Sequence, residues 1–167
     1  MRGIRTLVSM ALSRHDHVHL LICEGNHDEA SAVWLRHMFT LLYENEPRVS
    51  VNESELPFYS LKWGKTFLGF HHGHKVKNEQ LPGLFSAQFR QLWGETTRAY
   101  LHCGHRHHAD EKEYNGATVI QHPTLAARDA YAARGGWIAD RAVQAITYHR
   151  SYGQVSRTFV CPEMLAA

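Results

Sequence analysis

Apolar residues recur along the chain at two different spacings, and each spacing predicts a type of secondary structure. In Arg2–Arg14 they fall three or four positions apart, which is typical of one face of an amphipathic helix. The same spacing predicts helices over Glu29–Glu44 and Leu84–Thr97. The continuous apolar runs Val18–Cys23 and Ala99–Cys103 are short, and they predict buried strands.

Turn residues join three further pairs of short segments, which predicts three β-hairpins. The turns are Gly64-Lys65, Asn115-Gly116 and Tyr152-Gly153. The strands that they connect are Phe58–Trp63 with Thr66–Phe70, Glu113–Tyr114 with Ala117–Gln121, and Ala142–His149 with Gln154–Val160. Pro82-Gly83 is expected to break the chain before the third helix.

The order of these elements predicts an α/β fold. Strands alternate with helices in the first part of the chain and hairpins follow, which indicates a mixed sheet. The sequence contains no internal repeat, low-complexity run or long linker, so residues 1–167 are predicted to form a single domain.

The composition narrows the class of protein and singles out histidine. With 44% hydrophobic and 20% charged residues, the chain is typical of globular proteins. No apolar run approaches the roughly 18 residues of a membrane span, so we expect no membrane partner. The net charge of +2 is too small to argue for nucleic-acid binding. The 14 histidines are unusually many, and histidine is the commonest metal ligand.

The cysteines indicate a reducing compartment. There are three, with no CxxC pair, which argues against disulfides and against a compact zinc-binding module. A cytoplasmic location is the simplest interpretation. Cys23 and Cys103 end two predicted strands, where a thiolate could reach a metal, although a small buried apolar residue is the commoner role.

Three histidine-rich segments each follow a predicted strand. They are Asn26-His27-Asp28, His71-His72-Gly73-His74 and His105-Arg106-His107-His108. Ligands of open α/β sheets collect beyond the carboxyl ends of strands, so we expect the preceding strands to lie in one sheet, or in two packed sheets, with these ends together. Imidazole nitrogens with an amide or carboxylate oxygen would suit zinc, manganese or iron rather than calcium.

The same segments carry a family resemblance. Gly25-Asn26-His27-Asp28, His72-Gly73-His74 and Gly104-His105-Arg106-His107 resemble, in this order, the last three signature blocks of the calcineurin-like metallophosphoesterases. The resemblance spans about Val18–Thr124. It implies an α/β fold in which a layered mixed β-sheet sandwich is flanked by helices, as in the C-terminal part of a metallophosphoesterase domain.

The resemblance also implies roles for particular residues. Asn26, His72 and His105 correspond to ligands of the second metal of a two-metal centre, and His107 to a ligand of the first. His27 corresponds to the histidine that contacts the phosphate and protonates the leaving oxygen, and Asp28 to the residue that orients it.

Substrate contacts and cofactors follow from the same resemblance. Arg106 and His74 are candidates for binding the phosphate, and an exposed residue without a role is the alternative for each. The implied cofactor is a divalent transition metal (manganese, zinc or iron), with two ions in a complete site. The substrate is a phosphomonoester or phosphodiester, and nucleic acid remains among the candidates.

Two blocks of the family pattern are missing from the sequence. An Asp-x-His and a Gly-Asp-x-x-Asp segment supply the other first-metal ligands and the carboxylate that bridges both ions, and neither occurs here. We therefore expect the C-terminal portion of a phosphoesterase domain with an incomplete site. An N-terminal partner fragment or a second copy could complete it. The alternative is a non-catalytic remnant that acts in binding or assembly.

Overall fold

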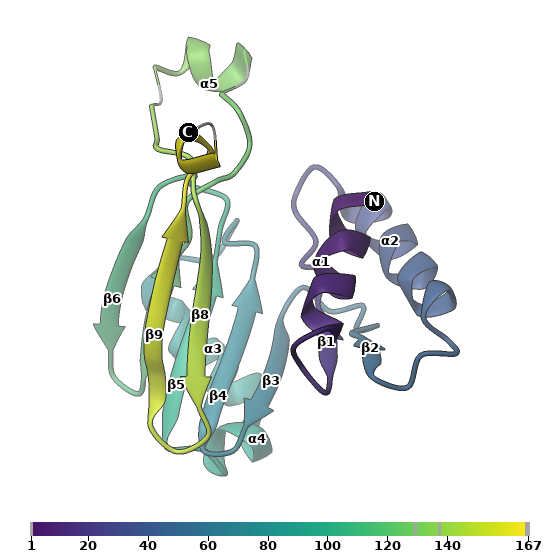
Figure 1. Ribbon diagram of the computed structural model, residues 1–167. Coiled ribbons are helices and arrows are strands. Elements are labelled where there is room, and N and C mark those ends of the chain that lie inside the picture. The colour runs from purple at the N-terminus through teal and green to yellow at the C-terminus, as the bar shows by residue number, and fades with distance from the viewer. Residues whose placement is uncertain (1, 129, 137, 166–167) are drawn as a thin grey trace. The chain divides into compact units, whose positions relative to one another are not determined.

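The computed structural model describes residues 2–128, 130–136 and 138–165, and the chain forms two compact units (Figure 1). The first unit is Met1–Pro57 and the second is Phe58–Ala167. The single-domain organisation expected from the sequence stays a prediction.

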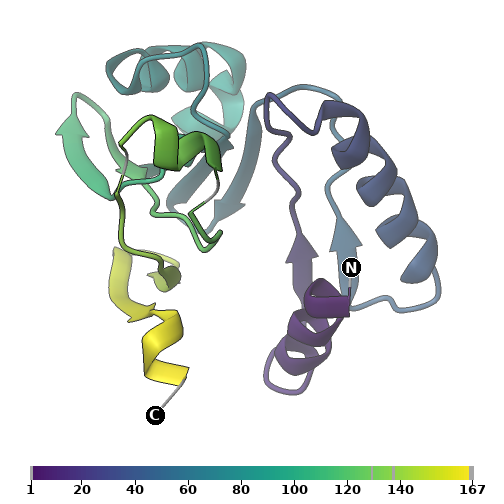
Figure 2. The ribbon, with the colours of Figure 1, turned by 90° about the horizontal axis from the view of Figure 1, so that it is seen from above.

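The first unit is a short parallel strand pair with two helices. Its elements are α1 (Arg2–Leu12), β1 (Val18–Leu20), α2 (Glu29–Leu42) and β2 (Val49–Val51). Figure 2 shows β1 and β2 running in the same direction. Val8 of α1 and Ala32 and Phe39 of α2 form the buried apolar core of this unit.

The strand prediction for this unit was only partly correct. The predicted strand Val18–Cys23 ends at Leu20, because the ladder to β2 stops after Asn52 N–H donates to the Leu20 carbonyl at 2.9 Å. The sequence did not predict β2, since three residues are too few to show a periodicity. The described part of β1 pairs with β2 in a sheet of its own and does not share a sheet with the other strands that precede histidines.

A five-stranded mixed sheet is the centre of the second unit. Its order is β3-β4-β5-β7-β6. The strands are β3 (Tyr59–Trp63), β4 (Thr66–His71), β5 (Arg98–Cys103), β6 (Asp110–Tyr114) and β7 (Ala117–Gln121). The central pairs β4–β5 and β5–β7 are parallel and the outer pairs are antiparallel. The predicted α/β fold with a mixed sheet and flanking helices is confirmed.

Helices cover one face of this sheet. They are the short η1 (Asn78–Gln80), α3 (Leu81–Gln88) and α4 (Arg90–Gly94). Alternate strand residues face them, among them Phe67, Leu101 and Val119, each no more than 1% exposed. Gly69 allows the close approach of α3, because a Cβ there would lie 2.6 Å from Leu101 Cδ2 and 2.8 Å from Phe85 Cε1.

The prediction of one helix over Leu84–Thr97 was wrong at both ends. Helix α3 begins at Leu81, because proline is well tolerated in a first turn whose N–H groups need no intrahelical partner. The expected break at Pro82-Gly83 therefore does not occur. The helix is instead interrupted at Phe89, with φ −115° and ψ 44°, before α4. This bend leaves Phe89 and Trp93 both packed against Phe67.

A hairpin covers the opposite face. Strands β8 (Val143–His149) and β9 (Gly153–Val160) are antiparallel, as predicted, and Figure 1 shows them on the side of the sheet away from α3. Two further short helices, α5 (Ala130–Arg134) and η2 (Pro162–Leu165), flank this hairpin in the sequence. The second unit thus has three layers, with the sheet in the middle.

A partly buried chain of hydrogen bonds joins the hairpin to the sheet. Tyr148 Oη lies 3.0 Å from His102 Nε2, and His102 Nδ1 lies 2.8 Å from His122 Nε2. Burial, together with the nearby His122 and Arg157, lowers the pKa of His102 to about 3. Burial also lowers the pKa of His122 and raises the pKa of Tyr148. Each neutral ring can donate through one nitrogen and accept through the other, so the chain is satisfied without a charge.

This network predicts a loss of stability in mild acid. In the unfolded chain His102 takes up a proton below its ordinary pKa of about 6.5, whereas in the native state it stays neutral down to about pH 3. The free energy of unfolding should therefore fall as the pH drops below 6.5, by up to about 1.4 kcal/mol per pH unit for this group. Urea unfolding between pH 5 and 7 measures the slope.

Two variants separate His102 from the other histidines. His102→Gln should flatten the slope, because glutamine does not titrate. His108→Gln, at an exposed position, should leave it unchanged. An unchanged slope in His102→Gln would contradict the assignment.

Candidate functional site

The two histidine segments of the second unit leave the sheet side by side. Strands β4 and β5 are parallel neighbours, and their last residues His71 and Cys103 are partners in the ladder. The prediction that three strands place their carboxyl ends together is confirmed for these two, and for Val18–Cys23 it stays a prediction. Just beyond them the Gly104 N–H donates to the His72 carbonyl at 2.9 Å, so the two loops are joined by their backbones.

This junction brings His72 and His105 together. Nε2 of His72 lies 3.1 Å from Nδ1 of His105, and the ring centroids are 5.0 Å apart. Two nitrogens that each lie about 2.0–2.1 Å from one metal ion are themselves about 2.9–3.4 Å apart, so this separation suits either a hydrogen bond or a shared cation. The His74 ring is also near, with its centroid 5.3 Å from that of His72 and 6.1 Å from that of His105.

Both loops make a three-residue turn with an unusual backbone. The Arg106 N–H donates to the Gly104 carbonyl at 2.8 Å, across His105 with φ +69°. The Val76 N–H likewise donates to the His74 carbonyl at 2.8 Å, across Lys75 with φ +65°. A γ-turn with positive φ at its central residue is rare and strained. Such strain persists only where the surroundings hold it, and it is commonest at functional sites.

Gly73 lets the two loops approach. Its φ is +101°, and a Cβ there would lie 2.8 Å from the Gly104 carbonyl oxygen and 3.4 Å from Cys103 Cβ. Any other residue at this position would combine backbone strain with a clash at the junction of the loops.

The other candidates of this unit are close to the pair in the sequence. His107 follows His105 by two residues, with φ +59°, and it is exposed, as is Arg106. His71 is buried, stacks on Phe58 at 4.4 Å between centroids, and places Nε2 3.1 Å from the His74 carbonyl.

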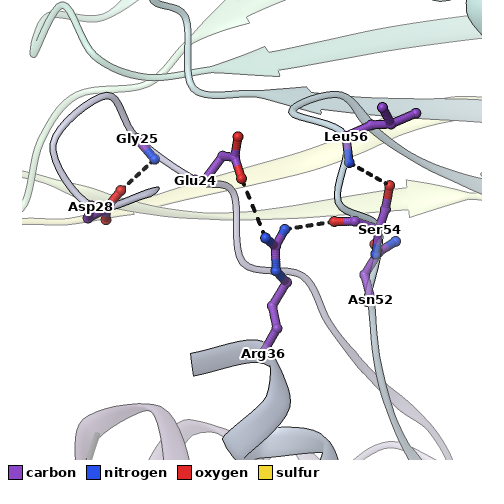
Figure 3. Close-up of polar contacts among 7 residues, drawn as sticks. All are labelled: Glu24, Gly25, Asp28, Arg36, Asn52, Ser54 and Leu56. Atoms are coloured by element: carbon purple, nitrogen blue, oxygen red, sulfur yellow. Dashed lines mark hydrogen bonds and ion pairs between the residues drawn. The ribbon is translucent and has the colours of Figure 1, made fainter. Parts of the chain in front are cut away.

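The Gly-Asn-His-Asp segment lies in the first unit. Asn26 and His27 form a turn, and Asp28 Oδ1 accepts a hydrogen bond from the Gly25 N–H at 2.6 Å, which closes the loop before α2 (Figure 3). His27 and Asp28 are exposed. A site shared by Asn26 with residues of the second unit stays a prediction, and so does the orientation of His27 by Asp28.

Sequence reasoning missed the buried arginine that supports this loop. Arg36 is 3% exposed, and its guanidinium donates to the Ser54 carbonyl at 2.8 Å and to Glu24 Oε2 at 3.4 Å (Figure 3). It thereby ties the residues before the loop to those after β2. In the sequence, an arginine in the middle of an amphipathic helix looks the same whether it is buried or exposed, so the burial of Arg36 could not be predicted.

Sequence reasoning also missed Gln121 at the end of β7. It is 1% exposed, its side-chain amide donates to the Gly104 carbonyl, and its Oε1 lies 3.5 Å from Cys103 Sγ. The available signal in the sequence was a polar residue at the end of an apolar run, which could have predicted a buried polar side chain there.

The donor set fits a metal ion in part. The His72–His105 pair has the separation of two ligands on one ion, yet no three His, Cys, Asp or Glu side chains in the described parts of the chain are placed to hold a metal. Burial raises the pKa of Cys103 to about 11 and that of Cys23 to about 12, so both thiols are protonated at neutral pH and are poor ligands.

Comparisons with known proteins do not identify a family for this chain. No family model and no curated protein matches the sequence. Among solved structures, a conserved uncharacterized protein from Streptococcus pneumoniae, described as a predicted phosphoesterase, shares 10% identity with a TM-score of 0.36. The alignment covers 87% of this chain and 88% of that one. At that score the similarity supports no argument, so the family stays a resemblance.

In the described part of the chain, no helix has both the length and the apolar character that crossing a bilayer requires.

The strain at His105 predicts an unusual order of stability. Replacement by glycine should leave the protein about 1–2 kcal/mol more stable than replacement by alanine, because glycine adopts positive φ without the steric cost of a Cβ. Urea unfolding of the two variants measures the difference.

The same pair of substitutions at His37 is the control. His37 is exposed in α2, where glycine should be less stable than alanine by about 1 kcal/mol. If the glycine variant were less stable than the alanine variant at position 105 as well, His105 would carry no backbone strain.

Proposed function

We propose that this chain is a metal-dependent phosphoester hydrolase that contributes an incomplete metal site. The supporting observation is the His72–His105 pair, with ring nitrogens 3.1 Å apart on loops that leave neighbouring parallel strands. Backbone strain at His105 supports a functional reason for this geometry, since an ordinary loop residue would relax to negative φ.

His72 and His105 would supply two imidazole ligands to a divalent ion. We propose the side-chain oxygen of Asn26 as a third ligand of that ion and His107 as a ligand of a second. The metal would be manganese, zinc or iron, which neutralises phosphate oxygens and activates water when bound. All four ligands are neutral, and we propose a partner fragment or a second copy as the source of the carboxylates that hold two ions together.

The remaining candidates would act on the phosphate. The His74 ring lies near the pair and Arg106 follows His105 in the chain. A guanidinium and an imidazole are both suited to binding phosphate oxygens. His27 would protonate the leaving oxygen as a general acid, with Asp28 orienting its ring. The substrate is a phosphomonoester or a phosphodiester, nucleic acid among them.

A non-catalytic role is the second candidate. It is favoured by the donor count, because the described residues place no three metal-binding side chains of the His, Cys, Asp or Glu types together. A chain of this kind would keep the sheet and the histidine pair for binding or assembly without turnover.

Hydrolysis of p-nitrophenyl phosphate and bis(p-nitrophenyl) phosphate with added manganese tests the proposal. We expect slow, manganese-dependent turnover by the unmodified chain, since one ion would be weakly held. His105→Ala should abolish it by removing a ligand. His27→Ala should lower kcat by about 10²–10⁴-fold with an alkyl phosphoester, whose poor leaving group needs a general acid, and by much less with the p-nitrophenyl esters.

His108→Ala is the matched control, because His108 is an exposed histidine of the same loop. It should retain turnover and metal binding. Calorimetric titration with Mn²⁺ separates the two candidates: metal binding without turnover would favour the non-catalytic role. Equal turnover in all four proteins would contradict the hydrolase.

A further inference from the structure

Gln121 occupies an unusual place for a polar side chain. It is the last residue of β7 and is 1% exposed, directly opposite Cys103 in the parallel ladder. Its neighbours in β7, Val119 and Ile120, are equally buried and apolar. A buried amide is costly unless its donors and acceptors are paired, so its contacts indicate why it is there.

The Gln121 side chain contacts the start of the His105 loop. Its Nε2 donates to the Gly104 carbonyl oxygen, and its Oε1 lies within reach of the Cys103 thiol, with Sγ 3.5 Å away. The thiol is a weak donor, so the bond to Gly104 is the stronger of the two.

The Gly104 carbonyl is the acceptor that closes the strained turn. It also receives the Arg106 N–H at 2.8 Å, across His105 with φ +69°. On the other side of the same residue, the Gly104 N–H donates to the His72 carbonyl at 2.9 Å. Gly104 is therefore hydrogen-bonded to both histidine loops. The side chain of Gln121, at the end of β7, donates a further hydrogen bond to its carbonyl.

The second loop repeats this arrangement. His71 is also a buried strand residue, and its Nε2 lies 3.1 Å from the His74 carbonyl oxygen. That carbonyl closes the other strained turn, across Lys75. In both loops a buried side chain at a strand end thus holds the carbonyl that accepts the turn's hydrogen bond.

We propose that Gln121 is a positioning residue that keeps the His105 ring aligned with His72 for metal binding. Without its amide, the Gly104 carbonyl keeps only the turn's own N–H as a described partner, and His105 can relax toward negative φ. That relaxation would rotate Nδ1 of His105 away from Nε2 of His72. The inference rests on the proposed function, because it assigns Gln121 to the same metal site.

The intact chain and its Gln121→Met variant test this assignment. Methionine has a similar length but no N–H, so it fills the space and removes the donor. Titration with Co²⁺, followed by its visible absorption, should show affinity weakened about 10–100-fold, as for other groups that orient metal ligands. Gln121→Leu also lacks the donor and should weaken binding if the methionine variant does not fold.

Val119→Ala is the matched control. Val119 lies two residues earlier on the same face of β7 and is 1% exposed, so the substitution opens a cavity while the amide remains. It should lower the midpoint of thermal unfolding and leave Co²⁺ affinity unchanged. Weakening equal to that of Gln121→Met would show a general effect of stability and overturn the proposal.

A measurement without metal separates this inference from the proposed function. In long-range ¹H–¹⁵N spectra of the metal-free protein, His105→Ala should shift the His72 ring nitrogens, because the rings are in contact. In the Gln121→Met background the same substitution should no longer shift them. Failure of the unmodified chain to bind Co²⁺ would contradict the proposed function, whereas a retained shift in the Gln121→Met background would overturn the role of Gln121.

Discussion

Parallel pairing of β4 with β5 is the constraint on which the candidate site depends. Because both strands run the same way and end in register at His71 and Cys103, the chain leaves the sheet twice at one edge. Parallel strands need a long crossover, and here η1, α3 and α4 supply it while covering one face of the sheet. The same segment therefore builds the core and returns the chain to the position from which His105 faces His72.

The junction of the two loops combines close approach with strain. Gly73 removes the side chain that would separate them, and the backbone bond from Gly104 to His72 joins them. Positive φ at His105 destabilises the native state, and the hydrogen bonds to Gly104 offset that cost. Local strain is thus maintained by interactions that lie deeper in the sheet than the histidines themselves.

Histidine has two opposite roles in this unit. His102 and His122 lie under the β8–β9 hairpin, where burial keeps the rings neutral and hydrogen-bonded to each other. His105 lies in an exposed loop at the end of the same strand as His102. A histidine that stabilises packing and one with access to a ligand thus lie only three positions apart in the chain. The number of histidines therefore says little about which of them bind a ligand.

The sequence by itself determined the local elements and the candidate segments. Apolar residues three or four positions apart, short apolar runs and turn pairs such as Asn115-Gly116 predicted α1, α2, the hairpins and the mixed α/β class, because these depend on neighbouring residues. Only the tertiary structure decided the bend at Phe89, the short β2, and the pairing of His72 with His105 through Gly73 and Gly104. It also decided the buried roles of Gln121 and Arg36, since a polar residue is buried or exposed according to partners distant in sequence.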